Sequence, residues 1–183
     1  MIELWKHFKT ITYHKYLVAK GCFKIGLYKQ GILHDLSKYS PSEFIVGASY
    51  FQGDRSPNNA EREAIGYSTA WMHHKGRNKH HYEYWFDYTC DPDKKHMIVP
   101  VPMPDKYIAE MIMDRIAASK VYQGENYNDS CPLAYYNPDK PHDIIHPETA
   151  EKLERMLRML AEEGEEKTFA CIKNELVKHK NSK

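Results

Sequence analysis

The chain has 183 residues, a length that suits one domain with a buried core, so we expect a single domain over residues 1–183. Its 26 Lys and Arg almost balance its 25 Asp and Glu, which leaves a formal charge of +1 and no net field to attract nucleic acid or an anionic membrane. The sequence contains no run of about 18 apolar residues, which excludes a membrane-spanning helix.

Histidine is abundant in this chain and cysteine is scattered. The eleven histidines supply the commonest protein metal ligand, which is also the side chain that titrates near neutral pH. Cys22, Cys90, Cys131 and Cys171 form no CxxC pair, and residues 1–17 lack the pattern of a secretory signal. We therefore expect a cytoplasmic protein. The sequence carries no signal that defines an oligomeric state.

The first predicted element is a helix over residues 2–30 with a bend near Gly31. Spacings of three and four residues define one buried face of this helix, and glycines weaken its end. The residues on that face are Leu4, His7, Ile11, His14, Val18, Cys22 and Ile25. Two histidines therefore lie on a predicted buried face.

A second helix is predicted from Ser40 through Tyr50. Ser40 is suited to the N-cap, Pro41 to the first turn, and Glu43 to a bond back to the cap N–H group. Residues 53–59 have loop composition, whereas residues 60–76 are expected to be helical and to lead into His80 and His81.

The second half of the chain begins with a long connection over residues 91–104. A helix then follows over residues 105–122, with Asp114 on an apolar face beside Met111 and Ala118. A bare carboxylate on such a face is costly, so Asp114 needs a partner.

Residues 125–146 have no regular pattern, while 147–163 and 168–178 are predicted as two closing helices, within a C-terminal segment 147–183. Because no β alternation is convincing, the predicted fold class is all-α.

His34 and Asp35 are the first candidates for chemistry. Neighbouring side chains cannot share one helix face, yet at a helix bend both can reach a single cation. Lys38 follows Asp35 by three residues, so its ammonium group would stand one helical turn from the carboxylate. This pattern predicts a metal ligand beside a cation that binds anions.

The order of these residues resembles the HD superfamily of metal-dependent phosphohydrolases. Its pattern is a histidine on one helix, a His-Asp pair on the next and a distant aspartate, as in His14, His34-Asp35 and Asp114. Several two-metal members also carry His-Asp-x-x-Lys and further histidines before the last aspartate. The matching residues here are Lys38, His74, His80 and His81.

A closer resemblance is to a family of uncharacterised small HD-like proteins of bacteria and phages, over roughly residues 10–150. It is carried by the segment Leu33–Ser40, by Glu43-Phe44, and by the run from His74 to Tyr84. The resemblance implies an HD-type helical bundle.

The resemblance implies a divalent ion held by His14, His34, Asp35 and Asp114. Asp35 could bridge to a second ion, so one or two ions are expected. The further ligands would be His74 with His81, which lies seven residues away and shares a helix face with it, or alternatively with His80. Imidazole and carboxylate ligands suit Mn, Fe, Co, Ni or Zn, with Mg as a further candidate.

The expected activity is hydrolysis of a small phosphate ester or a nucleotide, including cyclic nucleotides, by metal-activated water. Asp35 or a neighbouring carboxylate would accept the proton. Lys38, with Arg77 or Arg115, would bind the phosphoryl charge.

Two other functions fit the same residues. The HD branch that myo-inositol oxygenase represents holds two irons with four histidines and two aspartates. The matching residues here are His14, His34, Asp35, His74, His81 and Asp114. The third possibility is a non-catalytic module with a structural or ligand-sensing pocket.

An aromatic cluster follows the predicted helix over residues 60–76. Such clusters more often form core, and stacking on a nucleobase is the alternative. Its members are Trp71, Tyr82, Tyr84, Trp85, Phe86 and Tyr88.

Overall fold

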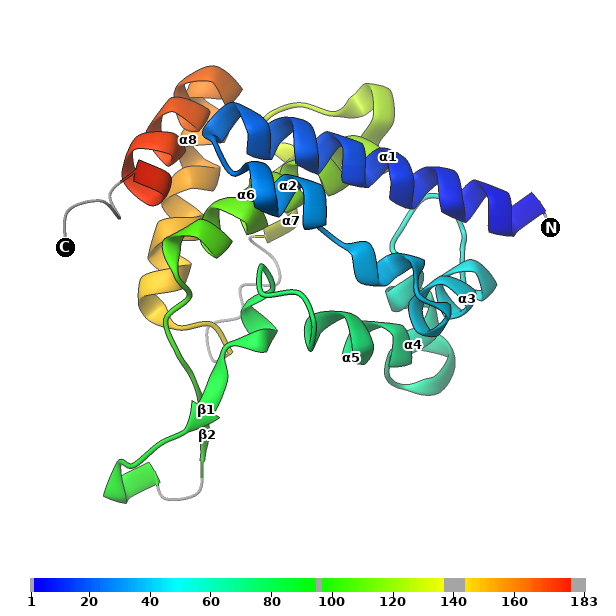
Figure 1. The fold of residues 1–183 in the computed structure, drawn as a ribbon, viewed down its shortest axis with the longest axis horizontal. Helices are drawn as coiled ribbons and strands as arrows, with labels where there is room; N and C mark the ends of the chain where they lie inside the picture. The colour runs from blue at the N-terminus through cyan, green and yellow to red at the C-terminus, as the bar shows by residue number, and fades with distance from the viewer. Residues whose placement is uncertain (1, 95–96, 137–143, 179–183) are drawn as a thin grey trace.

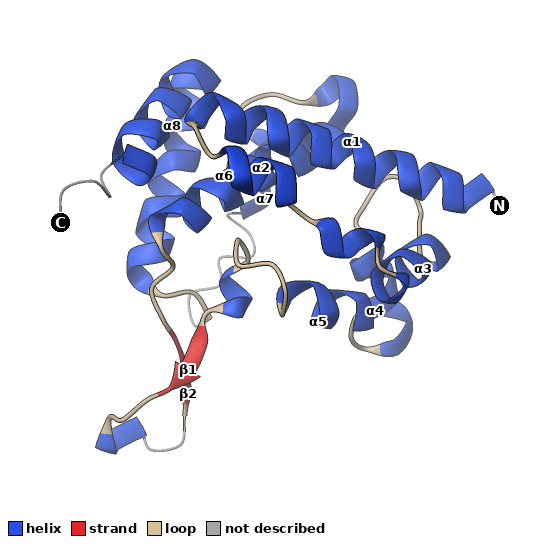
Figure 2. Ribbon diagram, viewed as in Figure 1, coloured by secondary structure: helices blue, strands red, loops and turns tan. Residues whose placement is uncertain are grey.

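The computed structural model describes residues 2–94, 97–136 and 144–178. The described chain is predominantly helical, as Figures 1 and 2 show, which confirms the all-α prediction. The helices are α1 (Ile2–Ile25), α2 (Tyr28–Leu33), α3 (Pro41–Ser49), α4 (Pro57–Ile65), α5 (Thr69–Lys75), α6 (Asp105–Gln123), α7 (Cys131–Tyr136) and α8 (Pro147–Ile172). The described residues also form two short strands, β1 (Phe86–Tyr88) and β2 (Ile98–Pro100).

Helix α6 forms the centre of the hydrophobic core. It packs against α1 and α8, so its residues are buried on more than one face. Ile108 and Ile112 of α6 are buried in one cluster with Val18 of α1 and Leu153 of α8. The sequence predicted one apolar face on the helix over residues 105–122. Helix α6 has more than one buried face, because α1 and α8 both pack against it.

The bend between α1 and α2 lies at Gly26, not near Gly31 as the sequence predicted. Gly26 has a φ of 88°, and the N–H group of Leu27 donates to the carbonyl of Cys22 at 2.8 Å. Gly31 lies inside α2, where an added Cβ would come within 2.9 Å of the Phe23 ring. The second glycine therefore allows close packing of α2 on α1, while the first ends α1.

The predicted buried face of α1 is confirmed from His7 to Ile25. Leu4, in contrast, is 44% exposed.

The single helix predicted over residues 60–76 is two helices, α4 and α5. Gly66 ends α4 in the left-handed region with a φ of 87°, and Ser68 caps α5 by accepting from the Trp71 N–H group at 3.0 Å. Buried Glu61 accepts hydrogen bonds from the hydroxyl of Ser68 at 2.5 Å and from the N–H group of Thr69 at 3.0 Å. A carboxylate thus neutralises the N-terminal end of the short helix that carries His74.

The sequence showed no convincing β alternation, and the expectation of no strands was wrong at the β1–β2 hairpin. The two strands pair antiparallel with Asp87 opposite Val99, and the hairpin projects from the helices in Figure 1. The irregular segment predicted over 125–146 also contains one short helix, α7. No described helix is both long enough and apolar enough to cross a membrane.

The closing helices are confirmed in outline. Helix α8 is interrupted at Gly164, which has a φ of 80° and a ψ of 174°, between the two predicted helices. One turn of π-helix, Lys173–Val177, follows α8.

Candidate metal centre

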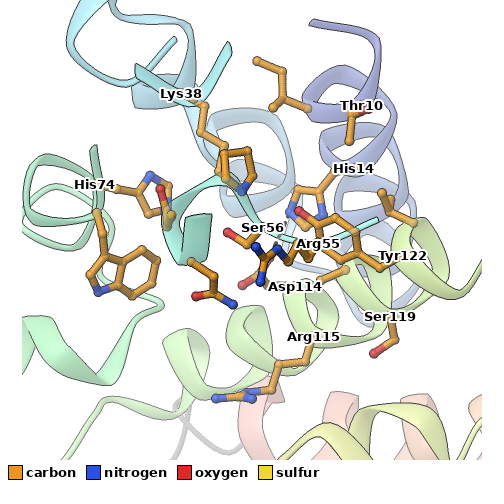
Figure 3. A pocket seen from close by; sticks show the side chains of 18 of the residues that line it. Thr10, His14, Lys38, Arg55, Ser56, His74, Asp114, Arg115, Ser119 and Tyr122 are labelled. Carbon is orange, nitrogen blue, oxygen red and sulfur yellow. Dashed lines mark ion pairs between the residues drawn. The ribbon is translucent and has the colours of Figure 1, made fainter. Parts of the chain in front are cut away.

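The fold brings together candidate ligands from four separate segments. Helix α1 contributes His14, the turn after α2 contributes His34 and Asp35, and α6 contributes Asp114. Helix α5 and the segment after it contribute the remaining histidines, and Figure 3 shows His14, His74 and Asp114 around one pocket. Among the described residues, three groups have ligand atoms within 4.8 Å of one another. The first is His14, His34, Asp35 and Asp114, the second is Asp35, His74, His80 and His81, and the third is His34, His80 and Glu110.

The turn after α2 directs two neighbouring side chains to one point. Helix α2 ends at Leu33, His34 is extended, and Asp35 has left-handed backbone angles with a φ of 53° and a ψ of 26°. Asp35 is the only non-glycine residue with positive φ in the described ranges. The Lys15 ammonium group donates to the carbonyl groups of Ile32 at 2.6 Å and His34 at 2.7 Å, which fixes this turn to α1.

The first group has the spacing of ligands around one cation. His14 Nε2 lies 2.9 Å from Asp114 Oδ1 and 3.6 Å from Asp35 Oδ2. His34 Nε2 lies 3.3 Å from Asp35 Oδ2 and 3.6 Å from Asp114 Oδ1. Ligand atoms bound to one ion at about 2.0–2.2 Å are themselves separated by about 2.8–3.6 Å.

The second group faces the other oxygen of the same carboxylate. Asp35 Oδ1 lies 3.3 Å from His74 Nε2 and 3.3 Å from His80 Nε2, while His74 Nε2 and His81 Nε2 are 3.0 Å apart. The sequence favoured His81 over His80 on the assumption of a continuous helix. Because α5 ends at Lys75, both histidines lie outside it and both turn toward Asp35.

Several buried polar atoms at this centre make no hydrogen bond of good geometry among the described residues, although some of them lie within ion-pair distance of Asp114 or Lys38. They are His14 Nε2, His34 Nε2, His80 Nε2, Asp35 Oδ1 and Asp35 Oδ2. Leaving such atoms unpaired is costly, and so many at one point is uncommon. A cation between them would satisfy these atoms together, so the residues present fit a divalent metal.

Glu110 was not predicted from the sequence, yet it supports both groups. Its Oε1 atom lies 3.0 Å from His34 Nδ1 and 3.2 Å from His80 Nδ1. If each imidazole donates from Nδ1 to this carboxylate, its Nε2 lone pair faces the centre, which is the usual support for a metal-bound histidine. Glu110 precedes Asp114 by four residues, so the two share a face of α6, and this spacing was the available signal.

Glu43 plays the equivalent part for His74 and was expected to cap α3. Its oxygens instead accept from His73 Nδ1 at 2.6 Å and His74 Nδ1 at 2.8 Å. Ser40 does occupy the N-cap position, but its side chain caps no N–H group within the described structure. The predicted capping box is therefore wrong, because Glu43 binds His73 and buried His74 instead.

Opposite charges at the centre stabilise each other. Burial alone would lower the pKa of His34, but Asp35 and the bonds to Asp114 and Glu110 raise it well above its usual value. Burial likewise opposes ionisation of Asp35, but His34, Lys38 and His74 hold the pKa of this carboxyl well below its usual value. Lys38 Nζ lies 2.5 Å from Asp35 Oδ2, across the short 3-10 helix that follows Asp35.

The centre opens on a pocket of about 520 Å³, lined by Lys38, His74, His81, Asp114 and Arg115 among others. In Figure 3, Lys38 and Arg115 lie on opposite sides of Asp114.

Arg77 is placed differently from the other two predicted substrate-binding residues. It is exposed, its guanidinium group donates to the His73 carbonyl at 3.2 Å, and it is not among the residues that line the pocket.

The predicted aromatic cluster is divided by the structure. Trp71 and Tyr82 line the pocket, while Tyr88 is 70% exposed on the hairpin. Trp85 packs against the hydrophobic core.

Comparison with known proteins gives a family but no activity. No curated protein and no solved structure matches the chain. A family model described as a family of unknown function, DUF5662, matches residues 3–159, which include every candidate ligand. The chain belongs to this family of unknown function, DUF5662.

Proposed function

We propose that this protein is a metal-dependent phosphohydrolase of the HD type, acting on a small phosphate ester or a nucleotide. The observation that carries the proposal is the position of Asp35. One of its oxygens faces His14 and His34, and the other faces His74 and His80, so one carboxylate lies between two candidate ligand groups. Paired divalent ions that share a bridging ligand are typical of phosphoester hydrolysis.

The bound ions would lower the pKa of a water molecule and neutralise charge on the phosphoryl group. The chain itself supplies the remaining functions. Lys38 reaches the pocket beside Asp35, so its ammonium group can bind a phosphoryl oxygen once cations compete for that carboxylate. Asp35 and Asp114 are the carboxylates placed to accept the proton of the attacking water.

The test is a screen of phosphomonoesters, nucleotides and cyclic nucleotides with Mn²⁺, Co²⁺, Ni²⁺ or Mg²⁺. We expect metal-dependent release of phosphate or of a nucleoside product. Lys38→Met should lower turnover by roughly 10²-fold or more while bound metal is retained, because its partner is the substrate anion.

Arg77→Met is the matched control, since it removes the same charge outside the pocket. Full activity in Lys38→Met, or loss of activity in both variants, would contradict the role given to Lys38. Metal binding without turnover of any compound would favour a non-catalytic module.

The ligand composition favours one second candidate, a di-iron oxygenase. Five imidazoles surround Asp35 and Asp114, and imidazole with carboxylate is a common environment for iron. Iron in the purified protein together with dioxygen uptake, and silence in the phosphatase screen, would select this function instead.

A further inference from the structure

The pocket extends past the candidate ligands, toward the segment after His81 and the middle of α6. Two buried atoms of opposite kind, Glu83 Oε2 and Arg115 Nε, have no hydrogen-bond partner there among the described residues. Both side chains line the pocket. Since buried polar atoms are nearly always paired, these two lack the partners that such atoms usually have.

The two side chains do not satisfy each other. No ion pair within the described ranges joins Glu83 to Arg115, and the Arg115 guanidinium instead lies over the Tyr136 ring, 5.4 Å from its centroid. Burial raises the pKa of the Glu83 carboxyl, and a hydrogen bond from its own backbone N–H group and the charge of Arg115 offset this only in part. A hydrogen-bond acceptor and a donor are thus held separately at one end of the pocket.

Aromatic side chains line the same pocket. Trp71 lies against the His81 ring at 4.7 Å between centroids, and the Arg62 guanidinium lies 5.6 Å from the centroid of its indole. Tyr82 lines the pocket as well, while Tyr136 is buried under the Arg115 guanidinium. Ring faces of this kind favour a flat, conjugated ligand, whereas a sugar or a phosphate alone would gain little from them.

The arrangement divides the pocket into two ends. Lys38 lies beside Asp35 at one end, and Arg115 lies across Asp114 from it, as Figure 3 shows. A volume of about 520 Å³ lies within the usual range of roughly 300–1,000 Å³ for pockets that bind small molecules. The pocket can therefore hold a ligand with a second recognition element beyond its phosphoryl group.

We propose that Glu83 and Arg115 bind the hydrogen-bonding edge of a nucleobase, which makes the substrate a nucleotide. The Glu83 carboxylate accepts a ring or amino N–H, and the Arg115 Nε–H donates to a neighbouring carbonyl oxygen or ring nitrogen. Nucleobases offer such donor and acceptor pairs on a flat ring. A sugar phosphate without a base would leave both protein groups unpaired. The inference rests on the proposed function only for the phosphoryl end of the pocket.

The test measures binding of nucleosides to the full chain by titration calorimetry. Adenosine, guanosine, cytidine and uridine contain no phosphate, so their binding is independent of hydrolysis, and ribose serves as the ligand without a base. We expect at least one nucleoside to bind about tenfold or more tightly than ribose. Glu83→Gln and Arg115→Lys should each remove most of this advantage, because each replaces a group needed for the base edge.

If the two variants keep their metal content and thermal midpoint, the fold and the metal centre persist in them. Arg77→Lys is the matched control, because Arg77 lies outside the pocket. Nucleosides that bind no better than ribose, or as well to both variants as to the unchanged chain, would overturn the inference. Nucleoside binding that is lost in the variants, without phosphate release from any compound, would support the inference and contradict the proposed hydrolase.

Discussion

Both the backbone conformation and the side-chain contacts of Asp35 hold its carboxylate at the candidate metal centre. Its left-handed conformation costs roughly 1–2 kcal/mol for a residue with a Cβ, although Asp and Asn tolerate it better than most. The surrounding contacts offset this cost, because Lys15 fixes the preceding carbonyl and Lys38 lies on the carboxylate. Strain of this kind often marks functional positions.

We expect Asp35→Asn to lose most bound metal while the far-UV helical spectrum is retained. Asparagine also tolerates the left-handed region, so the change removes the shared anionic ligand with little effect on the turn. Metal content after dialysis measures the result, and Asp87→Asn on the exposed hairpin is the control. Equal metal content in the two variants would disprove the proposed bridging role.

Glu110→Gln should weaken the binding of both ions together, by roughly 10–100-fold in affinity. The reason is that one Glu110 oxygen orients His34 in the first group and His80 in the second. Titration with Co²⁺, followed by its absorption spectrum, would report both positions. Loss of a single ion would show that Glu110 supports only one group.

The candidate metal ligands were predictable, and the residues that support them were not. His14, His34, Asp35 and Asp114 follow a recognisable order in the sequence. Glu43 was assigned to a helix cap because Ser-Pro-x-Glu is a local pattern, and a local pattern carries no information about His74, which lies 31 residues later. Likewise, nothing in the sequence around Lys15 indicates that its ammonium group binds a carbonyl group at the end of α2.

At the scale of elements, the contact between α1 and α3 is close because of one glycine. An added Cβ at Gly47 would lie 2.6 Å from His7 Nε2, and the His7 ring is itself enclosed by Phe44 and Phe51. Burial, together with the charge of Lys38, lowers the pKa of His7 to about 4, so this ring is neutral at pH 7.

Gly47→Ala should therefore destabilise the fold by about 1–3 kcal/mol, because the buried ring must move and its neighbours with it. For a chain of this length, each kcal/mol corresponds to roughly 2–4 °C in the thermal midpoint. Ala48→Gly, in which the neighbouring residue is changed, is a useful comparison for backbone effects. A thermal midpoint that is unchanged in Gly47→Ala would mean that α1 and α3 separate readily.

Helix existence was predicted better than helix ends. Periodicity identified α1 and α6, which each bury a face against a neighbour, while start signals and helix propensity identified α3 and the interrupted α8. The break between α4 and α5 was missed because glycine occurs both inside helices and at their ends. Here buried Glu61 accepts a hydrogen bond from the Thr69 N–H group at the start of α5, which makes Gly66 the end of α4. The hairpin was missed because each strand has only three residues, too few to show an alternation.

At the scale of the whole molecule, the candidate centre joins segments that are distant along the chain. His14 and Asp114 are separated by 100 residues in the sequence, and their side chains meet at 2.9 Å. The resemblance to HD proteins predicted this meeting, whereas composition and periodicity alone predicted only that Asp114 needs a partner. A cation at this point would connect α1 to α6, so metal binding should stabilise the fold as a whole.

This connection leads to a dependence of stability on pH that differs with and without metal. Without metal, protonated His34 and His74 neutralise the carboxylates. Asp35 raises the pKa of both histidines against the effect of burial, and Glu43 also raises that of His74. Groups whose pKa is raised by folding stabilise the fold fully below their unfolded value of about 6.5, and the contribution is lost as pH rises through the folded value. Conversely, the lowered pKa values of Asp35 and Asp114 stabilise the fold above about 3.9 and lose this effect as pH falls through the folded values.

We therefore expect the metal-free protein to lose stability as pH rises from 6 to 8, while the metal-loaded protein loses less. A cation replaces the protons of His34 and His74, so its affinity increases as those protons leave. Thermal unfolding at pH 6 and pH 8, with EDTA or with Mn²⁺, measures the stabilisation by metal, which should be larger at pH 8. Asp114→Asn should reduce that stabilisation at both pH values, and its own cost should shrink when EDTA is present. If Mn²⁺ raised the midpoint equally at the two pH values, and equally in Asp114→Asn, the ion would be bound elsewhere and the first ligand group would have to be abandoned.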